Sequence, residues 1–463
     1  MTLTKVLSIS QVLRPIRKMT SAAGSHSTPL RDSSWADGLR GLASLGVVSS
    51  HLVLCFALFL IPPATEGGTH IFQRPFFRLI VQGTAWVAIF FILMGFVNSL
   101  KPVKQSRAAQ TDAALAALAN SSFRRTSRLV MPATAATLLS WTLCQLGAYS
   151  VAQQADAYWM RSTAPLPSPS FSAAVIDFFK AILSTWTDAE NPYDQPQWAL
   201  LYLFKGSVLI FMTLLATINT TPKWRVFAEI GLYSWSWYMG DCLVGMNVYA
   251  GMILAELSMN PITVKPPKEL DIFTIPLAII GLFLCSFPTE YADTSNWSSF
   301  LMWLGMFIFP AGGDQGRFWS GIGAQLLCLA VLFSPTLKRL LTHPFLMWLG
   351  ASSFPIYLLH GPLVRSLLAW MTFGVGAMNF HPQPPPPTPE GEEPPPPQYI
   401  PMPPGWTLCV ILPAFAIALL SLCHVWTMRI EPLFGKATKR FEDICYGKYD
   451  KQQQQPVLPR HKD

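Results

Sequence analysis

Long apolar blocks recur along this chain, and they constrain its fold more than any other feature. Each block holds about 15–25 residues, and a helix that crosses the hydrocarbon core of a bilayer needs about 20. Only 13% of the 463 residues are charged, roughly half of the share that is typical of soluble domains. A soluble helical protein would need a polar face in every block, and most blocks have none. The sequence therefore predicts an all-α, multi-pass membrane protein.

We expect about ten transmembrane helices, with boundaries set to within a few residues. The blocks cover 38–61, 79–99, 129–152, 199–218, 226–239, 243–257, 273–287, 318–334, 346–371 and 406–428. The two halves of the hairpin 226–257 are short for a bilayer. The apolar stretch 297–310 could be a re-entrant segment.

The basic residues predict the orientation of the chain. With the N-terminus in the cytosol, 25 of the 33 Lys and Arg residues fall in cytosolic segments and 5 in non-cytosolic loops. Cytosolic loops of membrane proteins carry such an excess, so both termini are expected in the cytosol. The net charge of +8 comes from these flanking residues, which meet lipid headgroups, and no nucleic-acid partner is needed to explain it.

Three regions follow from this pattern. Residues 1–34 lack the uninterrupted apolar core of a secretory signal and read as a disordered cytosolic tail. Residues 35–430 form the transmembrane domain, and 431–463 form a second cytosolic tail. Within the domain, segment 381–404 is rich in proline, which predicts a stiff polyproline II loop on the non-cytosolic side.

The eight cysteines suggest neither a disulfide framework nor a metal site. Six of them fall inside apolar blocks, and no CxxC spacing appears. Cysteine in such blocks is mostly a small packing residue. We therefore expect no zinc centre.

The first apolar block, DGLRGLASLGVVSSHLVLCF, carries a candidate site at Arg40 and His51. Eleven residues of helix make three turns plus about 20°, so the two side chains share one face, ~16 Å apart along the axis. A titratable group at membrane depth usually faces the protein interior or a watery cavity. A packed histidine that bonds to a neighbouring helix is the alternative. Gly38, Gly41 and Gly46 should let other helices approach closely.

A second candidate is the arginine cluster in SSFRRTSRLVMPA, formed by Arg124, Arg125 and Arg128. Guanidinium groups bind phosphate oxygens in a forked geometry, so the cluster could hold the phosphates of a nucleotide-bearing donor. The alternative is that the cluster only satisfies the positive-inside rule and binds lipid headgroups.

The order of these motifs resembles the acyltransferase 3 family of integral membrane O- or N-acyltransferases, and most of all its fungal members. DGLRGLAS with its Arg and His is followed by FFILMGFVNS, FRRTSR, NPYDQPQWALLYLFKGS, FWSGIGAQLL and LGASSFPIYLLHGPL. The resemblance covers roughly residues 35–430. It implies transfer of an acyl group from cytosolic acyl-CoA, as co-substrate and with no other cofactor, to a hydroxyl or an amine of a small molecule or glycan, with a role in secondary metabolism.

The resemblance also implies roles for particular residues. His51 would be the essential histidine with Arg40 as its partner, and Arg125 and Arg128 would match an R-x-x-R motif that binds acyl-CoA, beside Arg124. A neutral imidazole can take a proton from an acceptor hydroxyl as the oxygen attacks a thioester. A fixed charge on Arg40 would favour the neutral imidazole. The tetrahedral oxyanion would need hydrogen-bond donors, and the candidates are Ser44, Trp198 and Tyr202.

The chain departs from the family pattern in its fourth apolar block. Where many relatives read W-T-x-x-x-E, this chain has Trp198 and, at the acidic position, Leu203. Asp194 lies just upstream on a non-cytosolic loop and is not an obvious replacement. A transporter or an inactive scaffold of the same fold is therefore the alternative function, although no internal repeat of the kind found in transporters is evident.

Two further polar residues lie at membrane depth in the ninth block. His360 is flanked by Pro355 and Pro362 and either lines the site or is structural. Arg365 is deep enough to need a partner or to snorkel to the interface. Asp241 and Glu256 could supply the partner carboxylate, and the sequence leaves this open.

Overall fold

The structure is a computed structural model that describes residues 33–65, 68–310, 313–381 and 398–447. Within these ranges the secondary structure is helical. Only two isolated bridges, Thr65–Gly68 and Ala155–Ile400, pair extended residues. The all-α prediction is therefore confirmed. The predicted N-terminal tail up to residue 32 and the proline-rich stretch 382–397 lie outside the described residues.

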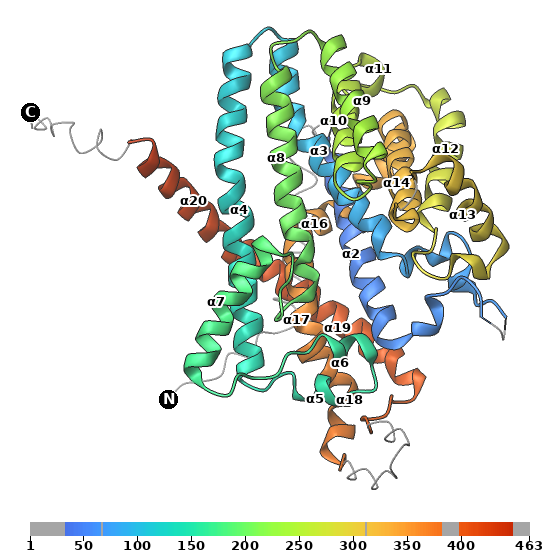
Figure 1. The fold of residues 1–463 in the computed structure, drawn as a ribbon, viewed down its shortest axis with the longest axis vertical. Helices are drawn as coiled ribbons and strands as arrows, with labels where there is room; N and C mark the ends of the chain where they lie inside the picture. The colour runs from blue at the N-terminus through green and yellow to red at the C-terminus, as the bar shows by residue number, and fades with distance from the viewer. Residues whose placement is uncertain (1–32, 66–67, 311–312, 382–397, 448–463) are drawn as a thin grey trace, which may run out of the picture.

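Five long helices form the body of the molecule (Figure 1). They are α2 (Ser34–Phe56), α3 (Gly83–Arg107), α4 (Thr111–Gln145), α8 (Ala199–Thr217) and α14 (Gln315–Phe333). The helix α3 packs against α2, α4, α8 and α14, so it lies at the centre of the bundle.

The remaining helices complete the bundle and its edges. They are α5 (Ser150–Gln154), α6 (Tyr158–Ser162), α7 (Phe171–Thr187), α9 (Pro222–Tyr238), α10 (Gly245–Leu257), α11 (Pro261–Val264), α12 (Asp271–Cys285), α13 (Asn296–Ile308), α15 (Pro335–Leu341), α16 (Pro344–Ala351), α17 (Ser353–Leu363), α18 (Ala369–Met378), α19 (Gly405–Val425) and α20 (Glu431–Cys445). Short 3-10 turns join several of them, including Gln195–Trp198 directly before α8.

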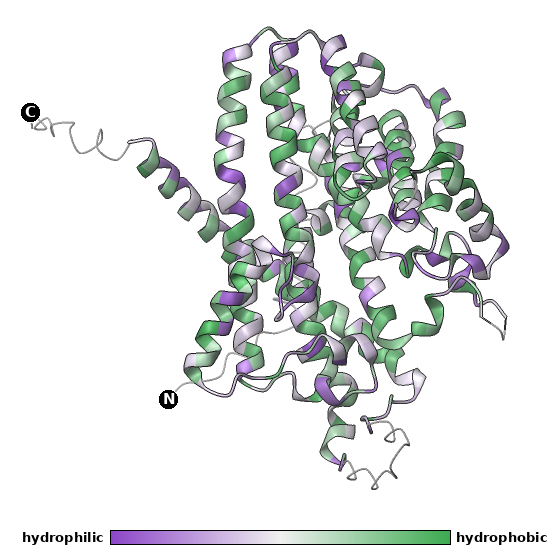
Figure 2. Cartoon of the chain, viewed as in Figure 1, coloured by the Kyte–Doolittle hydropathy of each residue, from purple (hydrophilic) through white to green (hydrophobic). Residues whose placement is uncertain are grey.

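Among the described residues, five helical stretches are long and apolar enough to cross a membrane: Ser34–Phe56, Gly83–Arg107, Gln195–Thr217, Gln315–Phe333 and Gly405–Cys445. Figure 2 shows hydrophobic residues along most of the length of the central helices, with hydrophilic residues frequent in the connecting loops. These apolar helices support a membrane protein. The expected number of about ten spans stays a prediction, because several of the other helices hold only 13 to 17 residues.

Two of the predicted apolar blocks are not continuous α-helices. Block 129–152 is interrupted because α4 ends at Gln145 and Gly147 adopts a φ of 75°, a left-handed turn that glycine allows without strain. Block 346–371 is divided among α16, α17, a π-turn at Val364–Leu368 and α18. Pro362 lacks a backbone donor two residues before the π-turn, which accounts for the distortion of the helix there.

The sequence left open whether the stretch 297–310 is a re-entrant segment. In the structure it forms the helix α13. Its 13 residues make a helix of ~20 Å, which is short for a bilayer of ~30 Å.

Glycines on α2 make room for its neighbours, as the sequence predicted. A Cβ on Gly38 would overlap the backbone of Leu341, and one on Gly41 would overlap the backbone of α16 around Gly350. A Cβ on Gly46 would meet the indole of Trp86 on α3. Close approach of helix backbones is the usual role of small residues in membrane bundles, and here it fixes α2 between α3 and α16.

The predicted C-terminal tail begins as a helix. In Figure 1, α20 extends away from the helical body after the π-turn Trp426–Ile430. Near its end it contacts α4, where Phe441 stacks on Phe123 with ring centroids 5.6 Å apart. The tail therefore contributes an ordered element next to the predicted arginine cluster.

Candidate active site

His51 and His360 form a hydrogen-bonded pair between α2 and α17. His360 Nε2 lies 3.0 Å from His51 Nδ1, and the His51 ring also stacks on Trp159 of α6 with centroids 4.6 Å apart. His360 is completely buried, and His51 is partly exposed and lines a cavity. The sequence allowed His360 to line the site or to be structural; His360 does not line the cavity and contacts it only through His51.

A backbone carbonyl determines where the protons of this pair sit. His360 Nδ1 lies 3.0 Å from the carbonyl oxygen of Ile356. A carbonyl only accepts, so His360 Nδ1 is the protonated nitrogen. In a neutral His360 the Nε2 atom is then an acceptor, and His51 Nδ1 must donate to it. This arrangement leaves His51 Nε2 with a free lone pair, which is the form that a general base requires.

Arg40 lies on the same face of α2 as His51, and both line the cavity. Its guanidinium donates to Asp37 Oδ1 at 2.8 Å and to the carbonyl oxygen of Gly350 at 3.3 Å. The shared face is therefore confirmed. Because Asp37 balances the charge of Arg40, Arg40 favours the neutral form of His51 less strongly than expected.

The buried guanidinium of Arg365 interacts electrostatically with both histidines instead. Its partner is Asp194, at 3.0 Å, with both side chains completely buried. Neither Asp241 nor Glu256 fills this role: Asp241 accepts from backbone amides at the start of α10, and Glu256 pairs with Arg107 and Arg225. Asp194, which was not expected to serve as its partner, thus neutralises the completely buried Arg365.

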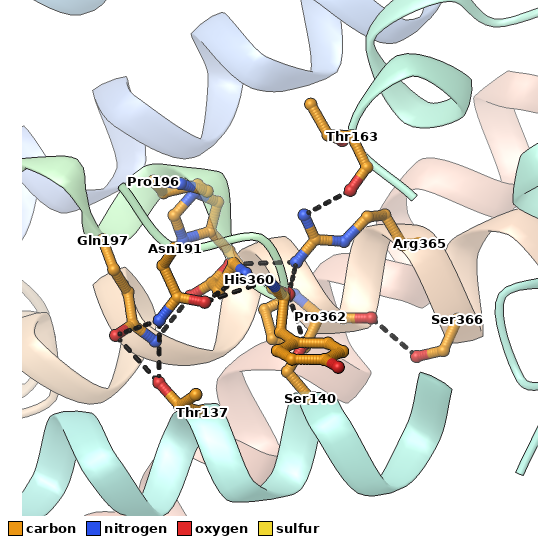
Figure 3. A network of polar contacts seen from close by, with 12 residues as sticks. Thr137, Ser140, Thr163, Asn191, Pro196, Gln197, His360, Pro362, Arg365 and Ser366 are labelled. Atoms are coloured by element: carbon orange, nitrogen blue, oxygen red, sulfur yellow. Dashed lines mark hydrogen bonds and ion pairs between the residues drawn. The ribbon is translucent and has the colours of Figure 1, made fainter. Parts of the chain in front are cut away.

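A hydrogen-bond network surrounds this ion pair (Figure 3). Arg365 also donates to the carbonyl oxygens of Tyr193 at 2.7 Å and Thr163 at 3.1 Å. Gln197 Nε2 donates to the second oxygen of Asp194 at 3.1 Å. Such a network holds a buried ion pair in place because most of its polar atoms have partners.

The same network positions the helix that carries His360. Tyr357 donates from its hydroxyl to the carbonyl oxygen of Pro196 at 2.6 Å. A Cβ on Gly361 would overlap the Asp194 carboxylate, so only glycine lets the two segments meet. The segment 191–198 thereby clamps α17 one turn before and directly after His360.

The arginine cluster divides into two parts. Arg125 and Arg128 line the cavity, and their charges act on each other and on Arg40. Arg125 donates to the neutral Ser207 Oγ at 2.9 Å and lies 3.3 Å from Met94 Sδ. Neither contact cancels the charge of Arg125, which remains available to an anion.

Arg124 points elsewhere and does not line the cavity. Its Nε and a terminal nitrogen lie 2.7 and 2.9 Å from the two carboxylate oxygens of Glu442 on α20. This forked hydrogen bond raises the pKa of Arg124. Arg124 therefore joins α4 to α20. This corrects the expectation that Arg124 lies with Arg125 and Arg128 in the donor-binding cluster.

A cavity of about 1000 Å³ is lined by candidate site residues from several helices. Its walls include Arg40, His51, Arg125, Arg128 and Trp198. These side chains come from three separate parts of the sequence, and the fold brings them together. Cavities of this size are typical of sites for small molecules.

The other expected site residues lie outside the cavity. Ser44 is buried, and its hydroxyl donates to the carbonyl oxygen of Gly41 at 2.7 Å. Tyr202 lines a separate groove and stacks edge-on against Trp198 at 5.8 Å. Of the three oxyanion candidates, only Trp198 lines the cavity.

Leu203 lines the cavity too, so the acidic position of many relatives is occupied here by an apolar side chain within the site. A carboxylate reaches the cavity from another element. Glu431, the first residue of α20, lines the same end of the cavity as Arg40 and interacts with it electrostatically. Sequence reasoning missed Glu431 because it assigned this residue to the cytosolic tail.

Trp159 was also missed, since α6 lies in a loop without an apolar block. The nearest signal was the density of aromatic residues in AYWMRS, which is weak by itself. Within residues 33–447, apart from the gaps noted above, no three His, Cys, Asp or Glu side chains cluster closely enough to hold a metal ion.

Comparison with known proteins defines the class to which this site belongs. The family model of the acyltransferase domain, acyltransferase 3, matches residues 33–424. The chain therefore belongs to the acyltransferase 3 family, and it is an acyltransferase. No solved structure matches the chain.

Three fungal relatives support the assignment. The O-acetyltransferase PaAT-1 of Phomopsis amygdali is 27% identical over 366 residues, 73% of each chain. The acyltransferase clz18 of Cochliobolus lunatus is 24% identical, covering 76% of this chain and 88% of its own. The acyltransferase R4 of a Phoma species is 23% identical, covering 74% and 86%.

Proposed function

We propose that the protein transfers an acyl group from acyl-CoA to a hydroxyl group, with His51 Nε2 as the general base. The observation that carries the proposal is the hydrogen-bond chain from the Ile356 carbonyl through His360 to His51, which leaves His51 Nε2 unprotonated at the cavity. Transfer to oxygen agrees with the name of the relative PaAT-1.

The reaction follows from this geometry. His51 Nε2 takes the proton of the acceptor hydroxyl as its oxygen attacks the thioester carbonyl carbon, and a carbon–oxygen bond forms. The tetrahedral intermediate then collapses, the carbon–sulfur bond breaks, and the proton passes from His51 to the departing CoA thiolate. The products are an ester and free CoA. Trp198 is the candidate donor to the oxyanion.

Arg125 and Arg128 bind the donor phosphates in this proposal. Both line the same end of the cavity as Arg40, and the charge of Arg125 meets only neutral partners. Guanidinium groups suit phosphate because they donate two parallel hydrogen bonds. The donor thus lies with its phosphates at the arginines and its thioester toward His51.

The topology forms part of the same proposal. Residues 35–430 span the membrane several times as the catalytic domain, and both termini, including α20, lie in the cytosol. The excess of basic residues in the assigned cytosolic segments supports this orientation. Acyl-CoA would then reach Arg125 and Arg128 directly from the cytosol.

The test uses the full chain purified into nanodiscs, with acetyl-CoA as the probe. Titration calorimetry should show that Arg125→Ala and Arg128→Ala each weaken acetyl-CoA binding about tenfold, as expected when a charged hydrogen bond is lost. Arg339→Ala is the matched control, because Arg339 is exposed and does not line the cavity. Equal affinities for all variants would contradict the donor site.

The base is tested separately. His51→Ala should lower the rate of acetyl-CoA turnover by about 10²–10⁴-fold, the usual contribution of a general base. Its affinity for acetyl-CoA should stay near that of the wild type. A variant that turns over acetyl-CoA at the wild-type rate would remove His51 from the mechanism and leave the arginine site standing.

A further inference from the structure

The cavity continues past His51, away from Arg40, Arg125 and Arg128. On α2, Arg40 precedes His51 and Leu54 follows it, and all three line the cavity. Beyond the end of α2, Leu58 and Ile61 also line the wall. We call the part between His51 and these residues the far end of the cavity.

The start of α3 and the start of α14 form the opposite wall of the far end. Thr84 and Val87 come from the start of α3, Val81 comes from the turn just before it, and Arg317 comes from the start of α14. A contact of 3.2 Å between the hydroxyls of Thr84 and Ser320 joins the two helices. Arg317, whose guanidinium carbon lies 5.8 Å from the ring centre of Trp198, and the exposed Glu290 also line the cavity.

Apolar side chains make up most of the wall next to His51 at the far end: Leu54, Leu58, Ile61, Val81 and Val87. Burial of apolar ligand surface against such a wall is favourable, and burial of an unpaired hydroxyl is not. The wall therefore favours an apolar acceptor over a polyhydroxylated one.

Several polar groups on the same wall already have partners within the protein. Ser50 donates to the carbonyl oxygen of Val47 at 2.8 Å, and the Gln82 amide donates to Thr84 at 2.5 Å. Asn247 donates to the carbonyl oxygen of Cys242 at 2.8 Å. A sugar would need partners for most of its hydroxyls, and the donor hydrogens of Ser50 and Asn247 are already used within the protein.

We infer that the far end binds the acceptor, and that the acceptor is a largely apolar molecule with an isolated hydroxyl group, not a sugar. The inference rests on the proposed function, since it takes His51 as the base that separates the donor end from the acceptor end. The single hydroxyl meets His51 Nε2, while the remainder of the molecule packs on the apolar wall. A volume of about 1000 Å³ accommodates such a molecule together with the arm of the donor.

The experiment compares acceptor classes in the full chain in nanodiscs with acetyl-CoA. Decan-1-ol and cholesterol represent apolar alcohols, and glucose and N-acetylglucosamine represent sugars. Mass spectrometry of the products should show an acetylated apolar alcohol with a kcat/KM at least about tenfold above that of either sugar, as expected for unpaired hydroxyls at an apolar wall. Preferential acetylation of a sugar would overturn the inference.

A wall variant tests the location. Val87→Thr replaces one methyl group of the apolar wall by a hydroxyl of similar size and should raise KM for the apolar alcohol about fivefold. The control is Val410→Thr, because Val410 is 66% exposed on α19. An unchanged KM in Val87→Thr would place the acceptor elsewhere.

Binding without turnover completes the test. In His51→Ala, native mass spectrometry should detect a bound apolar alcohol but no bound sugar. Failure to bind any alcohol, while acetyl-CoA still binds, overturns this inference alone. Loss of acetyl-CoA binding and hydrolysis in the wild type would instead overturn the proposed function.

Discussion

His360 Nε2 accepts a hydrogen bond from His51 Nδ1 across 3.0 Å, although the two residues are 309 positions apart in the chain. The contact joins the first long helix to α17 and orients the imidazole that lines the cavity. His360 does not line the cavity itself. We therefore regard it as a positioning residue, and His51 as the group that meets the substrate.

Replacement of His360 tests this relationship. His360→Ala should lower kcat for acetyl transfer by about 10–100-fold, because His51 loses the acceptor that fixes its tautomer. KM for acetyl-CoA should change little. His360→Gln should recover part of the activity, since the amide oxygen of glutamine can accept at the position of Nε2. Equal loss in both variants would indicate a purely steric role.

The buried pair Arg365–Asp194 should control the stability of the bundle. Asp194→Ala and Arg365→Met should each lower the free energy of unfolding by about 3–5 kcal/mol, because each leaves an unpaired buried charge. The double variant Asp194→Ala with Arg365→Met should lose less than the sum of the two single losses. Thermal unfolding in detergent measures all three proteins, and strictly additive losses would contradict the coupling.

Glu431 should influence donor affinity through charge. It is a carboxylate at the end of the cavity where Arg40, Arg125 and Arg128 lie, so it repels the donor phosphates. Glu431→Gln should lower KM for acetyl-CoA about two- to fivefold at low salt, and the effect should shrink at high salt. Glu269→Gln is the control, since Glu269 is exposed and outside the cavity. A higher KM would indicate that Glu431 instead orients Arg40.

Loss of Arg124 should loosen α20, whereas loss of Arg125 should weaken the binding of acetyl-CoA. Arg124→Ala removes the forked hydrogen bond to Glu442 and should increase hydrogen exchange along α20, because that contact holds the helix on α4. KM for acetyl-CoA should stay within about twofold of the wild type. An increase in KM like that expected for Arg125→Ala would place Arg124 in the donor site.

Much of the site was already evident in the sequence. Arg40 and His51 were placed on one face because an α-helix repeats every 3.6 residues, and both line the same cavity. Arg125 and Arg128 were predicted from residue type and spacing. The resemblance to the family, which rested on the order of short motifs, is confirmed over residues 33–424.

Other features depended on contacts between distant segments. Nothing in the sequence favours Asp194 over Asp241 or Glu256 as the partner of Arg365, because any of these carboxylates could neutralise it. Arg124 and Arg125 are adjacent and chemically identical, yet one binds Glu442 on α20 and the other faces the cavity.

The sequence by itself determined the helical class, the family and the helix face that carries Arg40 and His51, because these follow from local composition, periodicity and motif order. Only the tertiary structure decided which polar side chains meet. A buried charge or imidazole is stabilised by whichever partner the packing of helices brings within about 3 Å. Packing brought His360 to His51, Asp194 to Arg365 and Glu431 to the cavity.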